Sequence, residues 1–345
     1  MTAVAVPPTI IDCDPGVDDA HALFAAIGAR HLSGLEAVTV VAGNVALRHT
    51  RRNALRIREV AGLDAAALPV YAGCPGPMIG ALTDAADVHG ADGLDGAGLP
   101  EPQGEVEPIH AVAFLIDRLR RAAVEGRRVR LVTLGPLTNL ATALIMAPDI
   151  ADGLLEVRAM IGSAGRGNIT PAAEFNAYVD PEALERVATT LDAAGADGVP
   201  FYVYGLTLTH TVTADRTEIA RYAALDSRAG RAVAGMLGAY LDRHRVAPLP
   251  GMGGAPADEA PLHDPCVIAD LLAPGGVMAV PGRLRVVLHG PARGQTLASF
   301  DGGLGAGVGA GSRVVWMVEG DAGRLRAALF SAVSGFSAVT GFGNG

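Results

Sequence analysis

Residues 10–19, IIDCDPGVDD, place four carboxylates within eight positions directly after an apolar run. Asp12 and Asp14 are two residues apart, so in a strand their side chains lie on the same face. Asp18 and Asp19 follow a Pro-Gly turn and open a helix. Like charges at this density repel one another, and a buried unpaired carboxylate is costly. A Ca²⁺ ion offsets that cost, because it takes several carboxylate oxygens as ligands.

Two other interpretations, helix capping and phosphatase chemistry, explain the four aspartates less completely than a Ca²⁺ site does. Acidic residues at a helix start are stabilised by the helix dipole and by capping, which accounts for one or two of the four aspartates. The pattern DxDx[TV] of HAD-type phosphatases is similar, but Gly16 stands at its Thr/Val position and the lysine it needs is missing. The stretch therefore favours a divalent-cation site.

The elements that must position these aspartates alternate between strands and helices. Such alternation predicts an α/β fold, with a mostly parallel central sheet flanked by helices and a Rossmann-like core. Parallel sheets bind ligands at the carboxyl ends of their strands. The predicted strands are 9–14, 36–43, 68–73, 129–135 and 198–212 with its exit loop, and the predicted helices are 18–30, 46–62 and 109–126, followed by strands within 283–301 and 313–320 and a closing helix at 324–336.

Two stretches rich in Gly, Pro and Asp, 80–108 and 243–265, interrupt this alternation. Both are long for connections within a compact domain, so we predict that they are active-site loops. The length of 345 residues and an apolar content of 50% allow a large core, and we expect residues 1–345 to form a single domain.

Composition excludes several functions. A net charge of −9 without a basic tract argues against binding nucleic acid or a membrane surface. All 27 basic residues are arginine, which excludes chemistry that needs a P-loop, Schiff-base or kinase-type lysine. The N-terminus has neither a signal-peptide pattern nor an anchor. Three widely spaced cysteines without a CxxC pair predict a cytoplasmic protein.

Further blocks of sequence carry a resemblance to a known family. They are VVAGN (40–44), DVHG (87–90), TLGPLTNLA (133–141), GNITPAAEFNAYVDPEA (167–183) and LHDPC (262–266). With DCDPGVDD they resemble, in order along the chain, the inosine–uridine-preferring nucleoside hydrolases. The resemblance implies a Ca²⁺-dependent enzyme that cleaves the N-glycosidic bond of small-molecule ribonucleosides and assembles as a homodimer or homotetramer.

The resemblance also implies roles for individual residues. The Ca²⁺ ligands are Asp14, Asp19, Asp264 and the backbone carbonyl of Leu134, and Asp14 is the general base that activates water. His263 assists the leaving base, and with Asp14 and Asn44 it makes up the expected catalytic set. The substrate-binding positions are Asp18, His89, Met160, Asn168, Glu174, Asn176 and Asp264, while Tyr240 is a possible contact of the base.

Each of these residues also fits an ordinary structural role. Glu174 and Asn176 fit caps of the helix after DPEA (180–183), Asn44 fits a left-handed turn position, and Tyr240 fits a packed helix aromatic. These roles become less convincing when the residues are taken together, because all of the loops concerned lie at the carboxyl ends of strands in one sheet.

The residues considered so far do not identify which nucleobase the substrate carries. The only tryptophan is Trp316, so the loops lack the tryptophans that hold the base in purine-specific relatives. This absence favours inosine, uridine or pyrimidine nucleosides. Two alternatives are a hydrolase of another N-riboside, with nicotinamide or a modified base, and a Ca²⁺-dependent nucleoside-binding protein without turnover.

Overall fold

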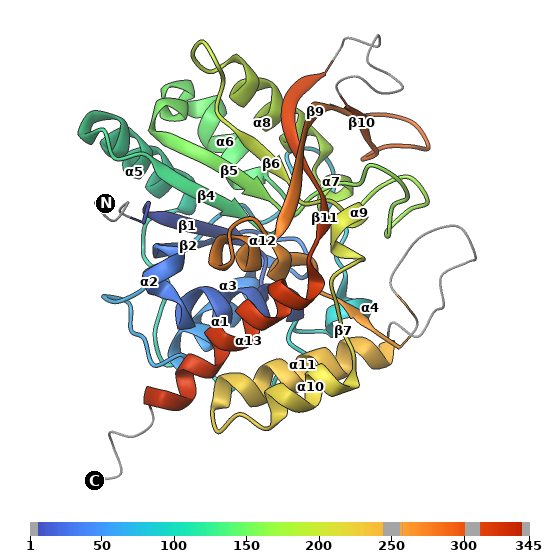
Figure 1. Ribbon diagram of the computed structural model, residues 1–345. Coiled ribbons are helices and arrows are strands. Elements are labelled where there is room, and N and C mark those ends of the chain that lie inside the picture. The colour runs from blue at the N-terminus through green and yellow to red at the C-terminus, as the bar shows by residue number, and fades with distance from the viewer. Residues whose placement is uncertain (1–5, 244–255, 257, 301–310, 340–345) are drawn as a thin grey trace.

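A computed structural model describes residues 6–243, 256, 258–300 and 311–339, and Figure 1 shows its central sheet between layers of helices. The sheet has nine strands in the order β10-β9-β11-β6-β5-β4-β1-β2-β3. Pairing is parallel from β3 through to β11, and β9 and β10 then continue the sheet in antiparallel fashion. The fold is therefore the mostly parallel α/β sheet that the sequence predicts.

The strands of the main sheet are β1 (Thr9–Cys13), β2 (Leu35–Val40), β3 (Val70–Ala72), β4 (Val129–Thr133), β5 (Leu154–Ala159), β6 (Phe201–Val203), β9 (Val277–Val286), β10 (Thr296–Phe300) and β11 (Ser312–Gly320), and β7 (Thr213–Ala214) pairs separately with β8 (Ala260–Pro261). The helices are α1 (Val17–Gly28), α2 (Arg30–Ser33), α3 (Leu47–Val60), α4 (Ala86–His89), α5 (Ala111–Glu125), α6 (Thr138–Met146), the 3₁₀ helix η1 (Pro148–Gly153), α7 (Phe175–Val179), α8 (Pro181–Ala193), α9 (Leu206–Thr209), α10 (Arg216–Ala223), α11 (Arg228–Arg243), α12 (His263–Leu272) and α13 (Ala322–Val339).

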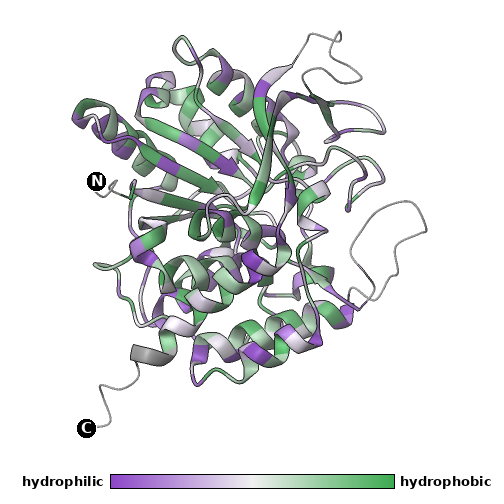
Figure 2. Ribbon diagram, in the orientation of Figure 1, coloured by the Kyte–Doolittle hydropathy of each residue, from purple (hydrophilic) through white to green (hydrophobic). Residues whose placement is uncertain are grey.

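Each face of the sheet has its own apolar core. Side chains alternate between the faces of a strand, so on β1 Ile11 and Cys13 pack on the side of α1, α11, α12 and α13, while Ile10 packs on the side of α5, α6 and α8. Figure 2 shows the apolar residues concentrated along the strands and on the helix faces turned toward them. A strand buried on both faces explains why β1 carries apolar residues, Ile10, Ile11 and Cys13, on both of its sides.

The predicted elements are confirmed within a few residues, with three differences. The exit from the strand in 198–212 contains the short helix α9 rather than only a loop. Strand β5 and helices α6 and α10 are among the elements additional to the prediction. In the loop 80–108 the four-residue helix α4 forms, whereas most of the loop 243–265 lies outside the described residues.

The carboxyl ends of the parallel strands place predicted site residues along one edge of the sheet. Asp14 follows β1, Asn44 lies beyond β2, Leu134 follows β4 and Met160 follows β5. This edge is therefore where a ligand site is expected. Among the described helices, none is long and apolar enough to cross a bilayer.

Candidate active site

A cavity of about 270 Å³ lies at this edge of the sheet. Its lining brings together residues separated by up to 246 positions in the chain, from Asp18 to Asp264. Every predicted substrate-binding residue contributes, as do the predicted catalytic residues Asn44 and His263, the predicted metal ligands Leu134 and Asp264, and Tyr240. The predicted residues in the lining are Asp18, Asn44, His89, Leu134, Met160, Asn168, Glu174, Asn176, Tyr240, His263 and Asp264.

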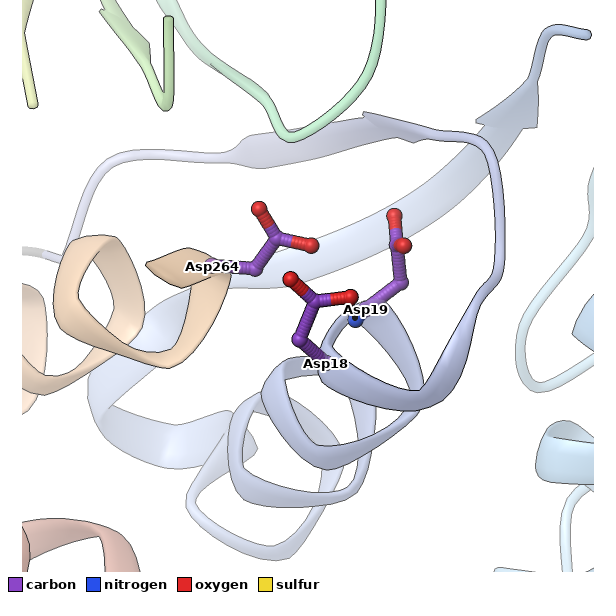
Figure 3. A group of neighbouring side chains, drawn as sticks. All are labelled: Asp18, Asp19 and Asp264. Atoms are coloured by element: carbon purple, nitrogen blue, oxygen red, sulfur yellow. Dashed lines mark hydrogen bonds between the residues drawn. The ribbon is translucent and has the colours of Figure 1, made fainter. Parts of the chain in front are cut away.

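Three carboxylates converge at the floor of the cavity. Asp18, Asp19 and Asp264 each offer one oxygen, and these oxygens all lie within 4.8 Å of one another (Figure 3). Asp18 and Asp19 come from the first turn of α1, and Asp264 comes from the first turn of α12. Asp18 is predicted to bind substrate, yet its carboxylate belongs to this cluster together with the predicted metal ligands Asp19 and Asp264.

Asp14 lies beneath the cavity with its side chain fully buried. Its Oδ2 accepts a 2.6 Å hydrogen bond from the backbone N–H of Asn44, whereas Oδ1 has no hydrogen-bond partner among the described residues. A Cβ at Gly43 or Gly135 would lie 2.0 or 2.4 Å from an Asp14 carboxylate oxygen, so glycine is required at both positions. The backbone here is built to let the Asp14 carboxylate fit.

The electrostatics of this cluster are unfavourable without a cation. Burial raises the pKa of Asp14 well above its usual range, and the charge of Asp19 raises it further. Burial followed by the charges of Asp18 and Asp19 does the same to the pKa of Asp264. An unpartnered buried oxygen and converging carboxylates are the donor set that a hard divalent cation requires, so the residues present fit a metal ion.

Asn44 ties two of these carboxylates together. Besides the backbone hydrogen bond to Asp14, its Nδ2 donates to Asp19 Oδ2 at 2.9 Å and to the Asp14 carbonyl at 3.2 Å. No non-glycine residue of the described chain has a positive φ, so the left-handed turn role of Asn44 is wrong. The side chain orients the acidic cluster.

Asn176 and Glu174 organise the opposite wall. Asn176 Nδ2 donates to the carbonyl oxygens of Leu134 at 2.8 Å and Met160 at 3.0 Å. The Glu174 carboxylate caps α7 by accepting from the backbone N–H groups of Asn176 and Ala177, and it also accepts from Gly162. Burial raises the pKa of Glu174 to about 7. Glu174 therefore caps a helix, but this helix is α7 and not the predicted one after DPEA, which Asp180 caps; Glu174 also lines the cavity.

Two histidines face the cavity from different elements. His89, at the end of α4, accepts the Val17 N–H on Nδ1 at 3.2 Å, and its ring lies 6.3 Å from that of Tyr240 between centroids. Burial lowers the pKa of His89, which keeps the ring neutral. His263, the first residue of α12, has its Nδ1 2.7 Å from the hydroxyl of Thr209.

The loop 80–108 is fastened to the rest of the fold. Arg243 of α11 donates to the Val88 carbonyl at 3.1 Å and forms an ion pair with Asp95. On the other side of the loop, Arg56 of α3 pairs with Asp92 at 3.1 Å. The position of His89 in the cavity therefore depends on both α3 and α11.

Several lining residues are absent from the predicted site residues. Asp84 and Ala85 belong to the loop 80–108, Asp87 and Val88 lie in its DVHG block without an assigned role, and Ile169 and Phe175 lie inside the GNITPAAEFN block. Trp316 is buried on β11 against Phe300 and does not line the cavity. The expectation of a cavity without tryptophan therefore holds for its described lining.

Known proteins similar to this chain share both its sequence and its fold. Residues 9–326 match the family described as inosine-uridine preferring nucleoside hydrolase. A pyrimidine-specific ribonucleoside hydrolase, RihA of Shewanella sp. (strain MR-7), is 40% identical over 267 residues, which cover 77% of this chain and 78% of that protein. An uncharacterized protein of Schizosaccharomyces pombe is 41% identical over 266 residues, covering 77% of this chain and 80% of the relative.

Solved structures agree. A plant nucleoside hydrolase, PpNRh1, superposes with a TM-score of 0.81 at 28% identity, covering 95% of this chain and 99% of its own. A purine-preferring ribonucleoside hydrolase from Gardnerella vaginalis gives a TM-score of 0.81 at 26% identity, covering 96% and 99%. The chain belongs to the inosine-uridine preferring nucleoside hydrolase family. It is a ribonucleoside hydrolase, an enzyme of the N-ribohydrolase class, and this class depends on a metal.

Proposed function

We propose that this enzyme uses Ca²⁺ to hydrolyse the N-glycosidic bond of ribonucleosides and prefers inosine and uridine or pyrimidine nucleosides. The proposal rests mainly on one observation, that the cluster of carboxylates adjoins the cavity. Asp18 and Asp264 belong both to the converging carboxylates and to the cavity lining. A cation held there would meet a substrate in the cavity directly.

We assign the cation to Asp14, Asp19, Asp264 and the Leu134 carbonyl. This carbonyl accepts one hydrogen bond from Asn176, and its second lone pair is available to a cation. When bound, Ca²⁺ supplies a position for the attacking water and the ribose hydroxyls and makes that water more acidic. In this assignment Asp18, which lies next to the metal ligands, binds the ribose.

The chain's own residues carry the remaining steps. Asp14 takes a proton from the attacking water, and its unpartnered Oδ1 is the acceptor. Asn168, Glu174 and Asn176 orient the ribose, whose glycosidic carbon becomes oxocarbenium-like as the bond breaks. His263 donates a proton to the departing base, a contribution of about 10²–10⁴-fold. Asn44 contributes through its hydrogen bonds to Asp14 and Asp19, which hold the two carboxylates in place.

Base preference is supported by the pyrimidine-specific relatives, of which the RihA above is one. Val88, Phe175 and Tyr240 supply an apolar portion of the wall, which suits a flat base. The other candidate substrate is an N-riboside of nicotinamide or a modified base. A nucleoside-binding protein without turnover is ruled out because the chain belongs to a family of hydrolases.

The test is release of free base and ribose from uridine, cytidine, inosine, adenosine and guanosine by protein treated with a chelator, before and after Ca²⁺ is restored. We expect no release after chelation and recovery with Ca²⁺, with uridine or inosine cleaved fastest. Equal activity in chelator would contradict the assigned cation. A purine preference led by guanosine would contradict the proposed specificity.

Three broader features belong to the same proposal. We propose that residues 1–345 act as a single domain, that the enzyme is a homodimer or homotetramer as its family resemblance suggests, and that it is cytoplasmic. The thiols of Cys13, Cys74 and Cys266 are all unpaired, which is consistent with a reducing compartment.

A further inference from the structure

The hydroxyl of Thr209 stands 2.7 Å from His263 Nδ1, and this contact has no counterpart in the motifs of the family resemblance. Thr209 is fully buried and does not line the cavity, whereas His263 is 7% exposed and does. Nδ1 therefore points into the protein, and the Nε2 edge of the ring is on the cavity side. The two ring nitrogens have different surroundings.

The backbone holds both partners of this contact in place. Thr209 ends α9, whose first turn is fixed by the hydrogen bond from Leu206 N–H to the Gly162 carbonyl at 3.0 Å. On the other side, the N–H of Leu262 donates to the Val212 carbonyl at 2.8 Å, just before His263 opens α12. β7 and β8 pair beside this bond. The distance between hydroxyl and imidazole is thus set by main-chain structure.

We propose that Thr209 is a positioning residue whose Oγ1 accepts a hydrogen bond from Nδ1–H of His263 and so makes Nε2 the atom that gives its proton to the departing base. The inference rests on the proposed role of His263 as proton donor. It adds the atom that donates and the residue that selects it.

The proton balance supports an accepting hydroxyl. Donation from Nε2 to the base requires a ring that carries protons on both nitrogens. As the glycosidic C–N bond breaks, its electron pair goes to the base, the Nε2 proton follows, and the ring is left neutral with its proton on Nδ1. The Thr209 hydrogen bond is the same before and after the step, so no rearrangement accompanies it. Asp14 then releases to solvent the proton it took from the attacking water, and solvent returns one to Nε2, so no net proton is consumed at the two residues.

The first test reads the tautomer directly and needs no turnover. In Ca²⁺-loaded protein labelled with ¹⁵N-histidine, and with His263→Gln used to assign its signals, we expect the neutral His263 ring to carry its proton on Nδ1. In Thr209→Val, which keeps the side-chain shape, we expect the commoner Nε2–H form. An Nε2–H ring in the unmodified enzyme would overturn the proposal.

The second test compares leaving groups. Uridine needs a proton on its base, whereas the 4-nitrophenolate of 4-nitrophenyl riboside leaves without one. We expect Thr209→Val to lower kcat for uridine by about 10–100-fold, within the contribution of a general acid, while 4-nitrophenyl riboside is cleaved nearly as before. Thr209→Ser, which keeps the hydroxyl, should recover much of the lost activity. Equal losses on both substrates would mean that Thr209 has only a structural role and would contradict the proposal.

These outcomes also separate the proposal from the proposed function. If the unmodified enzyme released no base from any nucleoside, the proposed function would fail, and the tautomer measurement would still decide whether Thr209 selects the protonated nitrogen.

Discussion

The side-chain amide of Asn176 donates a 2.8 Å hydrogen bond to the carbonyl oxygen of Leu134, the backbone group assigned to the cation. The same amide reaches the Met160 carbonyl at 3.0 Å. Asn176 belongs to α7, whereas Leu134 and Met160 follow β4 and β5. One side chain therefore fixes the spacing of two strand ends at the point where a ligand must bind.

Replacing Asn176 should weaken Ca²⁺ binding even though its side chain is not an assigned ligand. In Asn176→Ala the Leu134 carbonyl loses the donor that orients it, and we expect Ca²⁺ affinity to fall by about 10–100-fold, as is usual for groups that orient ligands. Calorimetric titration with Ca²⁺ measures this. Tyr178→Phe, on the same helix but outside the cavity lining, is the control and should bind Ca²⁺ normally.

Stabilisation by Ca²⁺ should increase with pH. Burial and mutual repulsion raise the pKa values of Asp14, Asp19 and Asp264 in the protein without metal, so the folded state holds protons that the unfolded state releases. These groups therefore cost stability as pH rises above the ordinary aspartate pKa of about 4. Ca²⁺ removes that cost, because it binds the deprotonated carboxylates.

The measurement is the difference in Tm with and without Ca²⁺, taken from about pH 4 to pH 7. Taking the difference cancels other titrating groups, such as His21, whose pKa burial lowers to about 3. We expect the difference to be small at the acid end and to grow toward neutrality. A difference that is constant across this range would argue against carboxylate ligands.

Asp14→Asn should separate stability from activity. The amide keeps the shape of the side chain and removes one of the crowded charges, so the Ca²⁺-free variant should unfold at a higher temperature than the Ca²⁺-free enzyme. Its turnover should fall by about 10²–10⁴-fold through loss of the general base. Thermal unfolding and uridine cleavage measure the two effects. Retained turnover would show that another group activates the water.

The first acidic motif predicts most of the carboxylate cluster because its residues are close in the sequence. Asp14, Asp18 and Asp19 fall within one strand, turn and helix start, whose geometry is local. Asp264 depends on α12 docking beside α1, and only the resemblance to the family indicates it. Contacts of this second kind need the packed fold.

Thr209 and the loop aspartates show what the sequence could not provide. Thr209 lies in a segment predicted as an exit loop, and its role emerges only when α9 brings it to His263, 54 residues away in sequence. Asp84 has no motif of its own, and Asp87 lies in the DVHG block without an assigned role; the folding of 80–108 makes both of them lining residues. The capping by Glu174 is predicted in type, although the helix it caps is α7 and not α8.

Glu174 should contribute to stability as well as to substrate binding. Its buried carboxylate accepts three backbone N–H groups, and Glu174→Ala leaves them without that partner. We expect a loss of about 1–3 kcal/mol in the free energy of unfolding, with a higher KM for uridine. Glu174→Gln, with one carbonyl oxygen, should lose less. Denaturant unfolding and steady-state kinetics distinguish this from a pure ribose contact, which would change KM alone.

Gly16 should tolerate no side chain, because it lies against two site residues. A Cβ there would be 2.6 Å from His89 Nδ1 and 2.8 Å from Asn44 Nδ2. Gly16→Ala must therefore displace His89, Asn44 or the turn between β1 and α1. Asn44 orders the acidic cluster and His89 borders the cavity, so we expect activity on uridine to fall by at least about 100-fold, the loss that a misplacement near 1 Å causes.

The matched control is Gly238→Ala, on α11, where an added Cβ meets nothing within 4 Å. This variant should keep its activity, because the added Cβ contacts nothing. It should also unfold at a slightly higher temperature, because alanine favours a helix over glycine by about 1 kcal/mol. Both variants should remain folded by circular dichroism, since Gly16→Ala strikes the ends of two polar side chains and not the apolar core. Full activity in Gly16→Ala would mean that His89 and Asn44 can move without consequence, and it would remove both from the catalytic arrangement proposed for this site.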